Sequence, residues 1–163
     1  MTEAAPPATA TPAALAALSL PAEERNPYPP PYDHACDGRF RRVLGDRFGL
    51  THFGVNLTEL RPGAASSLRH WHGAEDEFVY VLEGTPTLVT DAGETALAPG
   101  MCAGFRAGSG DGHRLENRSA AIVRYLEIGN RSAAETVEYP DADLRLEKGP
   151  GGRKFLHRDG TPY

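Results

Sequence analysis

The chain has 163 residues, a length typical of one domain, and its 40% apolar and 24% charged residues are those of an ordinary globular protein. Seventeen Lys and Arg stand against 22 Asp and Glu, and the net charge of −5 argues against nucleic acid as a partner. No run approaches the ~18 apolar residues of a membrane span, and Ala13 to Leu20 lacks the preceding basic residues of a secretion signal. We therefore expect a cytoplasmic protein without a membrane or nucleic-acid partner.

The first part of the chain differs from the rest in composition. Eight of the 14 prolines lie in residues 1–32, whereas all 18 glycines lie after residue 37. Residues 1–26 are rich in Ala and Pro and are expected to form a flexible tail, with one weak helical turn or two near its end. The prolines between Tyr28 and Tyr32 predict an extended arm, whose two tyrosines we expect to lie on the protein's own barrel or on that of a twin subunit.

From residue 40 onward, short apolar segments alternate with turns rich in Gly, Pro, Asn or Asp. Eight strands are predicted, at residues 53–57, 66–72, 77–83, 87–90, 95–98, 101–105, 113–117 and 121–128. This spacing indicates an all-β protein, built as a closed barrel or a double-sheet jelly roll. We divide the chain into a tail (1–26), a β-barrel domain with its N-terminal arm (27–139) and a C-terminal extension (140–163).

Four residues carry the chemistry that the sequence suggests. Residues i and i+2 of a strand point to the same face, so His70 and His72 are expected to project side by side. Glu77 follows after a Gly-Ala turn, and His113 begins a later strand that the fold can bring alongside. A single strand histidine is more often a hydrogen-bonded core or surface residue, but imidazoles clustered with a carboxylate suit first-row divalent metals. We therefore predict that His70, His72, Glu77 and His113 bind a divalent ion such as Mn, Fe, Ni, Co or Zn.

The spacing around these residues resembles the first motif of the cupin family: Gly63, six residues, His70-Trp71-His72, four residues, Glu77, six residues, Gly84. The match departs from that motif by one residue before His70. The second cupin motif is similar to Gly100, five residues, Arg106-Ala107-Gly108, four residues, His113, three residues, Asn117. Here Arg106 replaces the family's proline, and the loop before His113 is two residues longer.

A wider resemblance covers Tyr28 to Tyr163, which looks like a bacterial group of small single-domain cupins. It rests on segments such as Tyr28-Pro29-Pro30-Pro31-Tyr32, the run from Glu75 to Gly84, and the ending from Arg158 to Tyr163. The resemblance implies a double-stranded β-helix barrel that forms a homodimer and holds a metal ion inside, bound by the three histidines and the glutamate.

Four such ligands would leave positions open on an ion, where a small oxygen-rich molecule could bind. We therefore expect a metal-dependent enzyme of the dioxygenase, isomerase or lyase type that acts on a small molecule. The alternative is a non-catalytic module that binds a small ligand or a metal ion. The residues leave open which of the two the protein is.

Strand parity also predicts which side chains surround the site. Val79 and Val81 share the face of Glu77, and Leu115 shares that of His113, so the inner wall is expected to be mostly apolar, with few cationic groups. Asn117 is expected to stabilise a turn, and Tyr125 to be packed. The opposite face, with Trp71, Phe78, Tyr80 and Leu82, is expected to pack against a second sheet or a twin subunit. Cys102 is expected to be a buried, small apolar residue.

Overall fold

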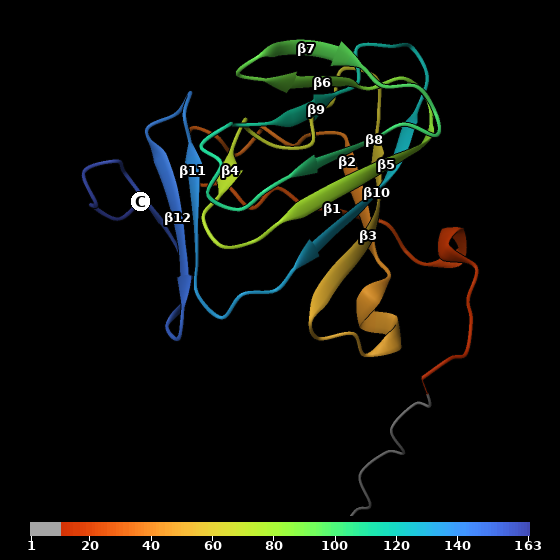
Figure 1. Cartoon of the computed structure of the whole chain (residues 1–163), viewed down its shortest axis with the longest axis horizontal. Coiled ribbons are helices and arrows are strands. Elements are labelled where there is room, and N and C mark those ends of the chain that lie inside the picture. The colour runs from red at the N-terminus through yellow and green to blue at the C-terminus, as the bar shows by residue number, and fades with distance from the viewer. Residues whose placement is uncertain (1–10) are drawn as a thin grey trace, which may run out of the picture.

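The computed structural model describes residues 11–163, and its regular elements are two short 3-10 helices and antiparallel strands (Figure 1). The helices are η1 (Ala17–Ser19) and η2 (Gly45–Phe48). The strands are β1 (Glu23–Glu24), β2 (Arg39–Val43), β3 (Phe53–Leu60), β4 (Trp71–His72), β5 (Glu77–Glu83), β6 (Thr87–Thr90), β7 (Gly93–Ala96), β8 (Cys102–Phe105), β9 (Arg114–Glu116), β10 (Val123–Asn130), β11 (Glu135–Tyr139), β12 (Leu144–Gly149) and β13 (Gly152–Leu156). All eight segments predicted as strands overlap one of these, from β3 to β10. The helical turn expected at the end of the tail is η1.

The strands form two layers. One layer is a six-stranded sheet in the order β1-β2-β3-β10-β5-β8. The other combines a four-stranded sheet, β13-β12-β11-β4, with a three-stranded sheet, β7-β6-β9, which lies at the top of Figure 1. Single antiparallel bridges, His70 with His113 and Ala65 with Glu116, connect these two smaller sheets. The predicted all-β jelly roll is confirmed.

Two hydrophobic clusters stabilise the layers. The first fills the barrel between them and is built around buried Leu60, Val79, Val81, Leu115 and Tyr125. Val79, Val81 and Leu115 therefore point inward, as parity predicted. Burial of such side chains contributes about 1.5–3 kcal/mol each.

The second cluster attaches the N-terminal arm to the four-stranded sheet. The ring of Tyr28 lies 5.5 Å from that of Tyr139 and 5.8 Å from that of Phe155, measured between ring centroids. The ring of Tyr32 similarly approaches Tyr163 near the end of the chain, at 6.3 Å. The arm thus lies on the protein's own barrel, which was one of its two expected positions.

Strands β12 and β13 lie within the segment that the sequence assigned to a C-terminal extension. Both extend the four-stranded sheet, and β12 pairs with β11 along five residues. Leu144 of β12 is fully buried. Strand β12 was not predicted because charged residues alternate with its leucines, so it does not form an apolar segment.

The outer face of β5 remains uncovered in the single chain. Phe78 is 40% exposed, Tyr80 39% and Leu82 46%. Within residues 11–163 no second sheet packs on these three side chains, so the packing against a second sheet that the sequence offered for this face is not found for them. Cys102, on the neighbouring strand β8, is also exposed, and its predicted burial is wrong. Within residues 11–163, no helix has the length and apolar character to cross a membrane.

Candidate metal centre

The backbone brings distant parts of the sequence together at one end of the barrel. His70 and His113 are opposite each other in an antiparallel bridge: the His113 N–H donates to the His70 carbonyl (2.8 Å) and the His70 N–H to the His113 carbonyl (3.1 Å). Opposed residues of such a pair project to the same side, so the two imidazoles become neighbours. His72 ends β4, and Glu77 begins β5 after a short turn.

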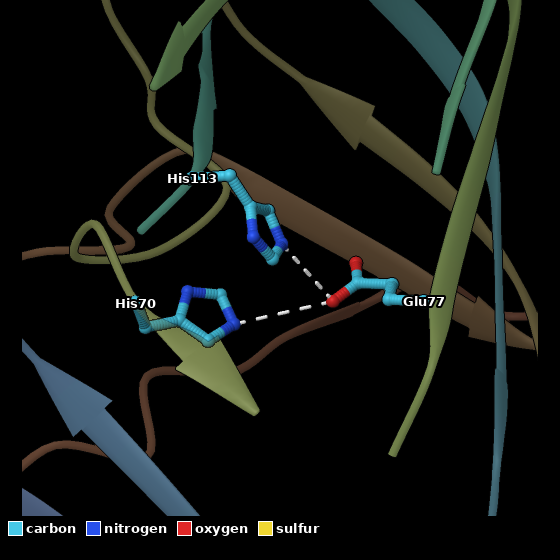
Figure 2. A group of neighbouring side chains, drawn as sticks. All are labelled: His70, Glu77 and His113. Carbon is cyan, nitrogen blue, oxygen red and sulfur yellow. Dashed lines mark hydrogen bonds and ion pairs between the residues drawn. The ribbon is translucent and has the colours of Figure 1, made fainter. Parts of the chain in front are cut away.

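The four predicted residues lie together, with Glu77 Oε2 as their common point. The distance to this oxygen is 3.3 Å from His113 Nε2, 3.5 Å from His72 Nε2 and 4.0 Å from His70 Nε2. Figure 2 shows His70 and His113 turned toward the Glu77 carboxylate. Donors bound to one ion at about 2.1 Å lie roughly 3.0–3.6 Å apart at ordinary coordination angles. Two of the distances fall in that range and the third is slightly longer. The donor atoms of His70, Glu77 and His113 lie within 4.8 Å of one another, so these three residues could hold a metal ion. His72 approaches the same Glu77 oxygen but is not part of that group of three.

Neighbouring groups fix the orientation of the imidazoles. His70 Nδ1 lies 3.0 Å from the Leu68 carbonyl oxygen, which can only accept, so Nδ1 carries the proton and Nε2 presents its lone pair toward Glu77. The His70 ring also stacks on the ring of Tyr139, with 5.9 Å between the ring centroids, and this contact limits how the imidazole can turn. His113 is buried and lies parallel to the Phe105 ring, with 3.5 Å between centroids. Both rings are held before any ligand binds.

The charge states of His70 and Glu77 match those that metal binding requires, whereas the pKa of His72 is raised: burial lowers it, but the hydrogen bond to Glu77 and the charge of that carboxylate outweigh burial. Burial, together with the nearby His113, lowers the pKa of His70 to about 3, so its imidazole is neutral at physiological pH. Burial alone would raise the pKa of Glu77, but hydrogen bonds from His113 and His72 hold it well below its usual range. A neutral imidazole and an ionised carboxylate are the forms that ligate a metal.

A second group, formed by His72, Glu75 and Glu135, also has its donor atoms within 4.8 Å of one another. Its carboxylates are already occupied. Glu135 Oε1 accepts from the backbone N–H groups of Gly73 and Thr136, both at 2.8 Å. Glu75 Oε1 accepts from Lys148 Nζ at 2.9 Å and from a backbone N–H. The hydrogen bonds of Glu75 and Glu135 therefore stabilise the turn between His72 and Glu77.

The metal-ligand candidates open into a cavity of about 610 Å³. Its wall is not mostly apolar, and this prediction from parity is wrong. Five cationic side chains line it: Arg39, Arg41, Arg131, Lys148 and Arg153. They come from β2, β12, β13 and the residue after β10, none of which lies in a predicted strand. Tyr125 was expected only to pack, but it both packs and lines the cavity.

Asn117 has the structural role that the sequence predicted. Its Nδ2 donates to the carbonyls of Leu60 (2.9 Å) and Ala121 (2.7 Å), and its Oδ1 accepts from the backbone N–H and hydroxyl of Ser119. These bonds close the turn before β10. Asn117 is therefore part of the scaffold behind the site.

Comparison with known proteins identifies the family. The family model of the cupin domain matches residues 56–129. The chain is similar to a crystal structure of a sugar phosphate isomerase of the cupin superfamily from Silicibacter pomeroyi: 43% of residues are identical, the TM-score is 0.89, and the match covers 92% of this chain and 96% of that one. The chain belongs to the cupin superfamily.

Two further solved structures extend this likeness. A proposed sugar phosphate isomerase from Acidithiobacillus ferrooxidans is 32% identical, with a TM-score of 0.71 over 77% of this chain and 80% of that one. The polyketide cyclase RemF from Streptomyces resistomycificus shares the fold at 21% identity, with a TM-score of 0.61 over 72% of this chain and 78% of that one. None of the curated proteins matches the chain.

Proposed function

We propose that this cupin is a metal-dependent enzyme that acts on a small, oxygen-rich molecule. The observation that carries the proposal is the approach of three imidazole Nε2 atoms to one Glu77 oxygen at the wall of a 610 Å³ cavity. His70, His72, Glu77 and His113 would hold the ion. When bound, a divalent ion would supply Lewis-acid chemistry by polarising an oxygen of the ligand.

The protein's own residues prepare this site in two ways. The Leu68 carbonyl keeps the His70 proton on Nδ1, so that Nε2 stays available. Phe105 covers one face of His113 and keeps water away from it. Both effects reduce the reorganisation that ligand binding requires.

Isomerisation of a sugar phosphate is the activity that we place first among the three reaction types. Two relatives with 43% and 32% identity are described as a sugar phosphate isomerase and a proposed one. A cavity lined by several cationic side chains also suits a ligand that carries negative charge.

The test combines metal analysis with a substrate screen. The purified protein is analysed for bound elements, reconstituted anaerobically with Mn, Fe, Ni, Co or Zn, and incubated with aldose and ketose phosphates, whose interconversion is followed by NMR. We expect turnover that is lost in His72→Ala and kept in His52→Ala, since His52 is exposed and outside the site. Ligand-induced melting shifts without turnover under any metal would instead support the non-catalytic binding module.

A further inference from the structure

A second polar cluster lines the same cavity as the metal-ligand candidates. We call it the cavity floor and define it as Arg39 and Arg41 of β2 together with Tyr125 and Glu127 of β10. All four line the cavity. Along β10, Gly129 pairs with Glu77, and Glu127 and Tyr125 follow at two-residue steps on the same face. The floor therefore continues the cavity wall from Glu77 along β10.

Glu127 is fully engaged within this cluster. Its carboxylate accepts from Arg41 Nη2 at 2.9 Å, from Asn56 Nδ2 at 3.2 Å and from Thr58 Oγ1 at 3.4 Å. The ion pair neutralises the charge of Arg41. Glu127 thus positions Arg41 and offers little to a ligand.

Two donors of the floor have no partner among residues 11–163. Tyr125 is 1% exposed, and its buried hydroxyl makes no hydrogen bond. Burial and the nearby Glu127 raise the pKa of Tyr125, so the hydroxyl keeps its proton. Arg41 Nε is also buried and unpaired. A buried donor without an acceptor is costly, which indicates that a bound molecule supplies the acceptor.

The floor also carries an unbalanced positive charge. Arg39 is 6% exposed and donates only to backbone carbonyls, from Nη1 to Ser66 and from Nη2 to Arg25. In the described part of the chain, no carboxylate oxygen lies within 4.0 Å of its guanidinium. Because the charges of Arg41 and Glu127 cancel, the charge of Arg39 leaves the floor with one net positive charge. A buried cation of this kind is stabilised by a bound anion.

We propose that the cavity floor binds an anionic oxygen group of the ligand, a phosphate or a carboxylate, through the Tyr125 hydroxyl, Arg41 Nε and the charge of Arg39. The rest of the ligand then extends toward His70, His72, Glu77 and His113. This inference rests on the proposed function and adds to it the position and chemistry of the ligand's charged end. Tyr125 is the specificity-determining residue, because it adds a donor where phenylalanine would fill the same space.

The test measures binding of inorganic phosphate and of acetate to the full chain by isothermal titration calorimetry. We expect saturable binding of at least one of the two anions, and the tighter one identifies the anionic group. Tyr125→Phe should weaken that binding roughly tenfold, since a hydrogen bond to a charged group is lost. Tyr80→Phe is the matched control, because Tyr80 lies on the outer face of β5, and its affinity should equal that of the wild type.

Arg39→Gln provides a second variant, which removes the charge and keeps a donor for the backbone carbonyls. This substitution should also weaken binding of the anion roughly tenfold or more. Circular dichroism checks that the variant folds. Absence of saturable binding of both anions, or equal affinities in Tyr125→Phe and Tyr80→Phe, would overturn the inference.

The metal content of every variant is measured in parallel, so that the two proposals can fail separately. Tyr125-dependent anion binding to a protein that retains no divalent metal after reconstitution would overturn the metal proposal alone. A metal-loaded protein whose anion binding ignores Tyr125 but is lost in His70→Ala would place the anion on the metal and overturn the cavity-floor inference alone.

Discussion

His70 and His113 face each other across one antiparallel bridge, although 42 residues separate them in the sequence. The bridge has two backbone hydrogen bonds, and it places the imidazole centroids 4.8 Å apart. Backbone pairing therefore makes the two side chains neighbours, and the Leu68 carbonyl and the Phe105 ring fix how the imidazoles are turned.

Metal binding should depend unequally on the four ligands. We expect His70→Ala and His113→Ala to lower metal affinity at least about a hundredfold, because each removes a neutral nitrogen donor from a preformed group. Glu77→Gln should weaken or change metal preference more modestly, since the amide oxygen still ligates but the negative charge is lost. Elemental analysis after dialysis measures the difference. Equal metal content in the wild type and all three variants would show that the group does not hold the ion.

Gly84 should be intolerant of a side chain. Its φ of +77° disfavours other residues, and a Cβ there would lie 2.7 Å from the Ile122 carbonyl oxygen. Gly84→Ala should lower the free energy of unfolding by about 2–4 kcal/mol, measured by urea denaturation. Gly93→Ala is the control: its φ is +124°, with no atom within 4 Å of the added Cβ, and it should cost only about 1 kcal/mol. Equal losses in the two variants would mean that the contact with the Ile122 carbonyl has no effect.

Tyr125→Phe should leave the ligand-free protein as stable as the wild type or more stable by about 1 kcal/mol, because the deleted hydroxyl is buried and unpaired. Chemical denaturation in a buffer without phosphate or carboxylate measures this change. A loss of 2 kcal/mol or more would mean that the hydroxyl has a structural partner.

The outer face of β5 should be the interface of the homodimer that the resemblance to small cupins implies. Phe78, Tyr80 and Leu82 are half-exposed there and form an apolar row. Leu82→Glu should convert a dimer to a monomer in light scattering coupled to size-exclusion chromatography, because burying an unpaired carboxylate is costly. Leu18→Glu serves as the control, since Leu18 is equally apolar and 59% exposed but lies in η1. A Leu82→Glu protein that remains dimeric would place the interface elsewhere.

Strands β3 to β10 could be predicted because their apolar residues and the glycine turns between them follow simple patterns. Strand β2 could not, since Arg39 and Arg41 occupy its inward positions and Phe40 faces the other way, under the Arg61 guanidinium. Inward charge is unusual in a strand, and here it occurs because the strand lines a cavity and not the apolar core.

In the candidate site too, the residues that follow a local sequence pattern could be predicted and the others could not. His70, His72 and Glu77 are close in sequence, so strand parity and spacing were enough to place them together. His113 is distant in sequence, and it was predicted because it begins a later strand that an antiparallel fold can bring alongside; its spacing to Asn117, which is similar to the second cupin motif, supported the prediction. The cavity floor depends on the pairing of β2 with β3 and of β3 with β10, and no local pattern reveals such a register.

Tyr139 touches both the N-terminal arm, through Tyr28, and the candidate site, through the stacked ring of His70. The first residues of the barrel domain and its last strands are thereby joined over the same side chain, with Phe155 beside it. Removing the arm around Tyr28 or strand β13 would take away part of the cluster around Tyr139 and loosen the His70 imidazole that stacks on it. The arm around Tyr28 and strand β13 thus belong to the scaffold of the candidate metal centre as much as the barrel strands between them.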